Sequence, residues 1–318
     1  MIVLEPDKSW DIIDSTKLNT FLECPRAYFY EYILGWRPEA PNLHLEFGKA
    51  WHLAMEHLII NGYKDESVRD AYMLFYNYYR QFFPEEMDES NAPKNPANAL
   101  RALQGYVHEY QQDIFTPIYT EIAGTVPIDE GRVLHFRMDS ILRTADGLYK
   151  SREHKTGSTL SRQWTDQWSL AIQVGTYNHV LYCLYPAEQV GGVEINGVFF
   201  QKIENKYQRV PARRSLKMMD VWQWNVLHIM NSIEFETHRM YDSFGLNTMQ
   251  AFPYNPTNCT KYFGCKYHDF CMSWANPLDH IEEIPFGFKV ERWDPSAEES
   301  TAKNVFHFDK TYNKDKEV

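Results

Sequence analysis

Three side chains in the stretch from Val133 to Gly157 could together do chemistry: Asp139, Glu153 and Lys155. Side chains alternate across a β-strand, so Glu153 and Lys155, which are two positions apart, point the same way. Two carboxylates and a lysine on one polar face could hold a divalent metal ion with a cation beside it. The alternative is a solvent-exposed face with ordinary ion pairs, and the stretch alone does not decide between the two.

Two paired strands must position these residues. The dipeptide Asp146-Gly147 lies between two β-rich runs and favours a type I′ turn, in which both residues have a positive φ. If the strands pair, Asp139 meets Glu153 and Lys155 on a polar face. The opposite face of the first strand is apolar enough to pack on a core and carries Leu134, Phe136, Met138 and Leu142.

Length and composition indicate an ordinary globular protein. The chain has 318 residues, of which 44% are hydrophobic and 15% aromatic, so it can hold one large or two modest domains. No apolar run approaches the length of a membrane span, and the N-terminus lacks the pattern of a signal peptide. We therefore expect a cytoplasmic protein without membrane contact, in which cysteines are more often ligands than disulfides. The net charge of −11 argues against indiscriminate nucleic-acid binding but allows a local basic groove.

Helical patterns dominate the chain before the predicted hairpin. Residues 47–60 form a strongly amphipathic pattern in which His52 and Glu56 share a face. Taken alone, His52 is more often a structural histidine than a metal ligand. Helical spacing over 66–83 and over 98 to about 115 predicts that residues 62–122 are a helical elaboration.

A long helix over 161–184 and a strand over 192–203 are predicted after the hairpin, followed by a helix over 216–242. Gln173 and Tyr177 are four apart on the first of these helices and share a face close to the hairpin. They could equally be a surface glutamine and a half-buried tyrosine.

A basic stretch follows the predicted strand. It is the best candidate for a track that contacts phosphates, although a solvated turn is an equal alternative. Its members are Lys202, Lys206, Arg209, Arg213, Arg214 and Lys217.

Three cysteines near the C-terminus, Cys259, Cys265 and Cys271, are spaced C-x5-C-x5-C in a segment rich in turn residues. Structural zinc sites favour shorter spacings, so an iron–sulfur cluster held by thiolates is the better interpretation. A 4Fe-4S cluster needs a fourth ligand, for which the chain offers Cys24 or Cys183.

In chain order, six features together resemble the PD-(D/E)XK nuclease superfamily. The pattern is similar to that of its RecB-like branch with an iron–sulfur cluster, which includes the CRISPR-associated four-cysteine nuclease, the nuclease domain of AddB, and exonucleases of phages and eukaryotes. The features are STKLNTFLECPRAYFY from Ser15, G-x-x-x-H at Gly48 and His52, Asp139, E-x-K-T-G from Glu153, Q-x-x-x-Y at Gln173 and Tyr177, and the cysteine triplet.

The resemblance implies roles for these residues. His52, Asp139 and Glu153 would bind one or two Mg²⁺ or Mn²⁺ ions, assisted by the backbone carbonyl of His154. Lys155 would orient or deprotonate the attacking water and stabilise charge on the phosphoryl oxygens. Gln173 and Tyr177 would steady the substrate strand or the lysine. The resemblance also selects Cys24 as the fourth cluster ligand, which makes the cluster a structural staple between the two ends of the chain.

The fold implied is α/β, a restriction-endonuclease-like central mixed β-sheet flanked by helices, with a helical elaboration and a C-terminal iron–sulfur staple. Residues 1–290 would form one domain, with the cluster segment at 253–274, and residues 291–318 a polar tail. Lys150, Ser151 and Arg152 stand where family members usually carry apolar residues. We therefore expect the strand before Glu153 to be less buried than usual.

The predicted function is metal-dependent DNA cleavage by a stand-alone exonuclease acting on single-stranded DNA or duplex ends. Phage DNA processing, recombination, repair and CRISPR adaptation all remain open as its setting, as does a protein partner that delivers the substrate. The alternative is a non-catalytic DNA-binding protein that retains the fold and the cluster. A structural protein stapled by zinc is a third interpretation.

Overall fold

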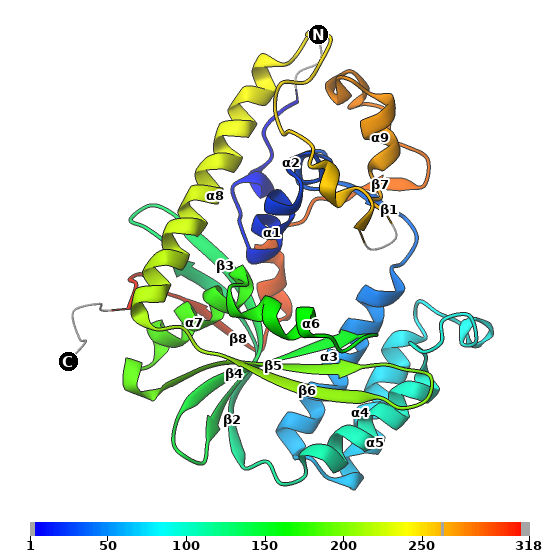
Figure 1. The fold of residues 1–318 in the computed structure, drawn as a ribbon, viewed down its shortest axis with the longest axis vertical. Coiled ribbons are helices and arrows are strands. Elements are labelled where there is room, and N and C mark those ends of the chain that lie inside the picture. Colours follow the sequence, from blue (N-terminus) through cyan, green and yellow to red (C-terminus); the bar gives the residue numbers. More distant parts are fainter. Residues whose placement is uncertain (1–3, 262–263, 313–318) are drawn as a thin grey trace.

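The computed structural model describes residues 4–261 and 264–312. Its centre is a mixed sheet of six strands with helices on both faces (Figure 1). Across the sheet the strands are β6 (Lys206–Ala212), β5 (Val190–Phe199), β4 (Tyr149–Gly157), β3 (Val133–Thr144), β2 (Phe115–Pro127) and β8 (Asn304–His307). The β4–β5 and β2–β8 pairs are parallel and the other pairs are antiparallel. The predicted α/β class with a mixed sheet is confirmed.

Helices cover the sheet and extend beyond it. None of them, within the described part of the chain, is long and apolar enough to cross a membrane. The α-helices are α1 (Ser15–Glu23), α2 (Pro25–Tyr28), α3 (Leu43–Asn61), α4 (Asp65–Tyr79), α5 (Pro96–Tyr110), α6 (Arg162–Asp166), α7 (Ile172–Leu184), α8 (Leu216–Asp242) and α9 (His268–Ser273). A small two-stranded sheet of β1 (Trp36–Pro38) and β7 (Phe288–Val290) lies beside α9 (Figure 1).

Two hydrophobic cores lie on opposite sides of the central sheet. The larger one packs α1, α7 and α8 against the sheet and includes Ile195 of β5. The smaller one packs α3, α4 and α5 and includes Val198 and Phe200. Because side chains alternate along β5, residues of opposite parity reach the two cores. The strand that neighbours β4 is therefore buried on both faces.

The hairpin between β3 and β4 forms at the predicted place, but its turn is not type I′. Gly147 has a φ of 85°, whereas Asp146 does not have a positive φ. The amide of Gly147 donates to the carbonyl of Thr144 at 2.9 Å, and the amide of Thr144 donates to the carbonyl of Leu148 at 2.9 Å. This is a type I turn closed by a glycine in the left-handed region, which needs only one positive φ.

The predicted helical elaboration is confirmed only in part. Helices α4 and α5 lie within residues 62–122, but α5 ends at Tyr110 and the chain enters β2 at Phe115. The run FTPIYTEIAGTVP is rich in β-branched and aromatic residues, and it pairs with β3 along most of its length. From Phe115 onward, the chain is therefore a strand paired with β3 and no longer a helix.

The segment after residue 291 is not a tail. Its residues 295–301 form a 3₁₀-helix, and β8 adds a parallel edge strand to the sheet next to β2. Gly124 makes this approach possible, because a Cβ there would lie 1.7 Å from the carbonyl oxygen of Phe306. Residues 313–318, the end of the predicted polar tail, lie outside the described residues.

The predicted helix over 161–184 is interrupted. It consists of α6, a 3₁₀ turn over 167–169 and α7, because Ala171 has an extended ψ of 136°. The Arg214 guanidinium donates to the carbonyls of Ser169 and Ala171 at the break. The Ala171 carbonyl also accepts from the Gly175 amide at 3.1 Å as α7 begins. Arg214 thus stabilises the interruption.

Candidate active site

The predicted catalytic carboxylates meet where β3 and β4 separate. The last paired residues of the two strands are Ser140 and Arg152. Just beyond them, the Asp139 amide donates to Oε1 of Glu153 at 3.0 Å, and the His154 amide donates to Oδ2 of Asp139 at 2.7 Å. The fork between the strands therefore holds both carboxylates through backbone groups.

His52 reaches this fork from α3. Its Nδ1 lies 3.0 Å from Oδ1 of Asp139, and its side chain is half-buried. Burial lowers the pKa of His52, but the neighbouring Asp139 carboxylate outweighs this effect and raises it overall. The helix and the hairpin, predicted separately, thus bring His52 and Asp139 into contact.

The surroundings shift the pKa values of the two carboxylates in opposite directions. Burial, followed by the charge of Asp139, raises the pKa of Glu153 well above its usual range. Burial also acts to raise the pKa of Asp139, but His52 and other nearby positive groups hold it below its usual range. Two buried carboxylates this close cannot both stay charged without a compensating cation.

Lys155, Gln173 and Tyr177 surround the same point. Lys155 supplies positive charge that lowers the pKa of both Glu153 and Asp139. Gln173 Nε2 donates to Tyr177 Oη at 2.8 Å, and Tyr177 donates onward to the carbonyl of Arg137 at 2.5 Å. Burial, and then the charges of Glu153 and Asp139, raise the pKa of Tyr177, so it lies near both carboxylates.

The geometry agrees with a comparison of the whole sequence. The sequence model of the PD-(D/E)XK nuclease superfamily matches residues 15–272, which span α1 to α9. The chain belongs to the PD-(D/E)XK nuclease superfamily. Membership implies a metal-dependent nuclease whose substrate is DNA.

Comparisons beyond the superfamily model are less informative. No curated protein sequence matches the chain. Among solved structures, 11 chains match, one of them the crystal structure of SSO0001. That structure is 12% identical, with a TM-score of 0.32, and the match covers 71% of this chain and 78% of that one.

The residues at the fork suit the metal that the superfamily implies. An imidazole and two carboxylates are ligands that Mg²⁺ and Mn²⁺ accept, and the raised pKa of Glu153 indicates that a cation would relieve the pair. Within residues 4–261 and 264–312, no three His, Cys, Asp or Glu side chains are already gathered as a metal site. Oε1 of Glu153 instead accepts from the Asp139 amide and from Ser151 Oγ.

The four cysteines of the predicted cluster come from both ends of the domain. Cys24 lies between α1 and α2, and its Sγ accepts from the Asn255 amide at 3.3 Å. Burial raises the pKa of Cys265, and the thiols of Cys24 and Cys259 raise it further. Burial likewise raises the pKa of Cys271, with contributions from Cys24 and Cys265.

The remaining cysteine lies elsewhere. Cys183 is on α7, and its Sγ lies 3.9 Å from the carbonyl oxygen of Lys310. All five cysteines are free thiols. Cys24 contributes to the raised pKa of both Cys265 and Cys271, but within residues 4–261 and 264–312 the cysteines are not gathered as a metal site.

The predicted basic track does not form as a single surface. Arg214 is buried at the helix break described above, and Arg209 is held 2.5 Å from Asp113 and 3.5 Å above the Tyr110 ring. Neither is available to a phosphate, so the prediction is wrong for these two residues. The four exposed members are Lys202, Lys206, Arg213 and Lys217.

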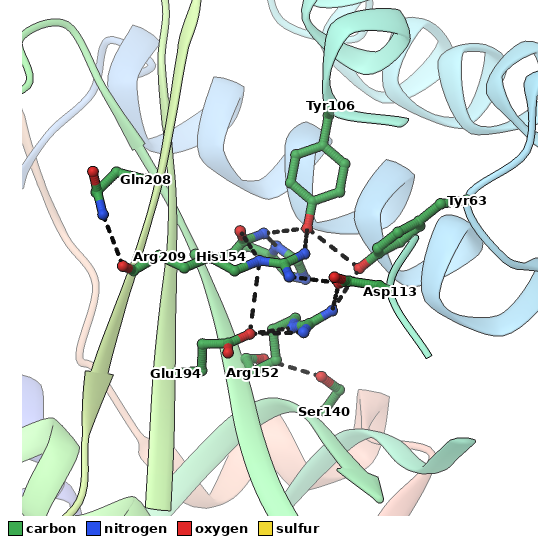
Figure 2. A network of polar contacts seen from close by, with 10 residues as sticks. Tyr63, Tyr106, Asp113, Ser140, Arg152, His154, Glu194, Gln208 and Arg209 are labelled. Atoms are coloured by element: carbon green, nitrogen blue, oxygen red, sulfur yellow. Dashed lines mark hydrogen bonds and ion pairs between the residues drawn. The ribbon is translucent and has the colours of Figure 1, made fainter. Parts of the chain in front are cut away.

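Behind the fork lies a buried polar network that the sequence did not reveal (Figure 2). Arg152 forms ion pairs with Glu194 at 2.7 Å and with Asp113 at 3.2 Å, and its side chain is only 7% exposed. Arg209 joins the same acids from β6. Ser151 and Arg152, directly before Glu153, are therefore buried, contrary to prediction, because acids from two other segments neutralise Arg152.

Glu121 is a second residue that sequence reasoning missed. It lies in β2 between the residues that pair with Ser140 and Met138, and therefore opposite Asp139. Its φ is 46°, its carboxylate binds Arg137 at 2.7 Å, and burial and then Asp139 raise its pKa. Its place opposite Asp139 could not be predicted while residues 62–122 were assigned to helices, because it depends on the pairing of β2 with β3.

Proposed function

We propose that the protein is a deoxyribonuclease that removes nucleotides from single-stranded DNA or from duplex ends, using Mg²⁺ or Mn²⁺ bound by His52, Asp139 and Glu153. The observation that supports this most is the arrangement at the fork between β3 and β4. There the His52 imidazole contacts the Asp139 carboxylate, and the Asp139 carboxylate accepts from the amide of His154. The Glu153 carboxylate in turn accepts from the amide of Asp139. The bound metal would supply an activated water and neutralise developing charge on the phosphate.

The protein residues would position and stabilise the reacting groups. Lys155, on the same strand as Glu153, would place positive charge where the phosphoryl oxygens become more negative. Tyr177 and Gln173 would hold the backbone of Arg137, and with it the strand that carries Asp139. His52 would keep the Asp139 carboxylate oriented through its Nδ1 contact.

Cleavage of end-labelled single-stranded DNA tests this proposal. Anaerobically purified protein is incubated with Mn²⁺ or Mg²⁺, beside the variant Glu153→Ala. We expect cleavage that needs the metal and is lost in the variant, and the label reports the direction of digestion. Cleavage only at internal positions would favour an endonuclease. If the folded wild-type protein binds the DNA but does not cut it, the chain is a DNA-binding protein that retains the fold.

We also propose that Cys24, Cys259, Cys265 and Cys271 hold a 4Fe-4S cluster. The mutual influence of their thiols and the bond from Asn255 to Cys24 support this. Cys183 provides a matched control because it contacts Lys310 instead. Iron and labile sulfide should be lost in Cys24→Ser and retained in Cys183→Ser. Zinc in place of iron, or equal losses in both variants, would refute the proposal.

The exposed lysines of the basic stretch beside the β5–β6 turn, Lys202 and Lys206, would contact the DNA backbone, whereas Arg213 and Lys217 follow the other end of β6. Lys206 lies at the start of β6 and lines a pocket of about 570 Å³ between α5 and the β5–β6 turn, together with Arg101 and His108. A DNA strand that runs from the fork toward this pocket would pass the C-terminal end of β4. The experiment that tests this contact is the salt dependence of binding, described below.

A further inference from the structure

The side chain of His154 is buried next to the candidate active site and has not been given a role. It lies between Glu153 and Lys155 in sequence, so on β4 it projects to the other side of the strand. The residue is 1% exposed. Its Nδ1 lies 2.8 Å from Nδ2 of Asn196, whereas its Nε2 has no hydrogen-bond partner among the described residues.

The surrounding network determines which nitrogen of His154 carries the proton (Figure 2). Arg209 Nε lies 3.2 Å from Oδ1 of Asn196, and an arginine can only donate, so this Asn196 atom is the oxygen. The other Asn196 atom is therefore the NH₂ group, which donates to Tyr106 Oη at 2.7 Å and to His154. Nδ1 of His154 must accept this bond, and a neutral ring then carries its proton on Nε2.

This buried N–H group lies beside the carboxylate fork. The backbone amide of His154 binds Asp139, and the His154 ring centroid is 6.4 Å from that of His52. A buried donor left without an acceptor costs about 1–3 kcal/mol, so such a group is normally satisfied in the functional state. The candidate metal centre, whose His52 ring lies 6.4 Å from this ring, is a place where additional oxygen atoms would be bound.

We propose that His154 is a further active-site residue whose Nε2–H donates to an oxygen held at the metal centre. That oxygen belongs either to a metal-bound water or to the phosphodiester that is cut. The proposal rests on the proposed nuclease function. It also excludes His154 Nε2 as a direct metal ligand, because a ligating nitrogen needs the lone pair that the proton occupies.

The protonation of the His154 ring can be measured without any catalytic turnover. In protein labelled with ¹⁵N-histidine, the chemical shifts of the two ring nitrogens distinguish a protonated nitrogen from an unprotonated one. The His154 signals are identified by their loss in His154→Gln. We expect Nε2 to be protonated in the wild type. In Asn196→Asp the new carboxylate should attract the proton to Nδ1.

Addition of ligands identifies the acceptor. A shift of the Nε2–H signal on adding Mg²⁺ alone would indicate a metal-bound water. A shift that requires single-stranded DNA together with Ca²⁺ would indicate the phosphate. An unprotonated Nε2 in the wild type, or a signal that neither addition moves, would overturn the proposal.

Two variants provide a matched functional comparison. Gln at position 154 can place an N–H donor close to the position of Nε2, whereas Asn reaches only the position of Nδ1. We expect His154→Asn to lower kcat/KM by about 10–100-fold, as for other residues that contact a metal's ligands, and His154→Gln to retain most of it. Equal losses in both would overturn the donor role. A wild type that shows the Nε2–H shift but cuts no DNA would instead contradict the proposed function.

Discussion

Replacement of Arg152 by Met tests how strongly the buried network supports the strand that carries Glu153. Arg152 is 7% exposed at its side chain, and its partners Glu194 and Asp113 are 16% and 24% exposed. Methionine has a similar volume and no charge, so the variant leaves two acids largely buried without their main partner. Removing one member of a buried ion pair typically destabilises a protein by about 3–5 kcal/mol.

The structure indicates the lower end of that range. Arg209 remains 2.5 Å from Asp113 and 3.7 Å from Glu194, and can partly compensate for both acids. We therefore expect a loss of about 3 kcal/mol. For a chain of this size this corresponds to a fall in Tm of about 4–5 °C. Urea unfolding followed by tryptophan fluorescence, together with thermal unfolding followed by circular dichroism, measures both quantities.

Arg162→Met is the matched control. Arg162 pairs with Asp166 at 3.1 Å on the surface, where the two side chains are 93% and 64% exposed. Exposed ion pairs of this spacing contribute about 0.3–0.5 kcal/mol at most. If Arg152→Met loses no more stability than this control, the network is not the buried support described here and the reasoning is refuted.

Gly124→Ala should detach β8 from the sheet, because the added Cβ would meet the Phe306 carbonyl. Faster amide hydrogen exchange in residues 304–307 would reveal this detachment. Unchanged exchange would contradict it and show that the strand can shift to accommodate the methyl group. Burial lowers the pKa of Lys94 to about 8. Between about pH 8 and 10.5, Lys94 is therefore protonated in the unfolded chain but largely neutral in the folded protein. The free energy of unfolding should rise with pH across this window by at most about 3 kcal/mol. In urea titrations, Lys94→Met should remove this part of the rise. A variant with the same pH dependence as the wild type would contradict the shift. Lys206→Ala should weaken DNA binding and reduce the slope of log K against log salt by about one, whereas an unchanged slope would exclude Lys206 as a phosphate contact.

The local chemistry of the site could be predicted from the sequence because it depends on short-range rules. Alternation along a strand places Glu153 and Lys155 together, and helical spacing places Gln173 one turn before Tyr177. The contact between His52 and Asp139 needed the resemblance to a family, since no local pattern joins α3 to β3. All of these positions agree with the structure, while their roles in catalysis stay predictions.

The long-range features could not be predicted in the same way. Arg152 looked like an exposed residue because its neutralising partners, Asp113 and Glu194, are far away in sequence. Spacing alone could not distinguish Arg209 and Arg214 from phosphate-binding residues, because both are buried only by tertiary contacts. Helical spacing before β2 also concealed Glu121, whose position opposite Asp139 depends on strand pairing.

The most direct test of the central claim is a comparison of the wild type with Asp139→Asn in single-turnover cleavage of end-labelled single-stranded DNA across a Mn²⁺ titration. The substitution keeps the shape of the side chain that contacts both His52 and the His154 amide, but removes its charge. We expect metal-dependent cleavage by the wild type and a loss of at least about 100-fold in the variant. Equal cleavage by both proteins would contradict a metal centre at the fork between β3 and β4.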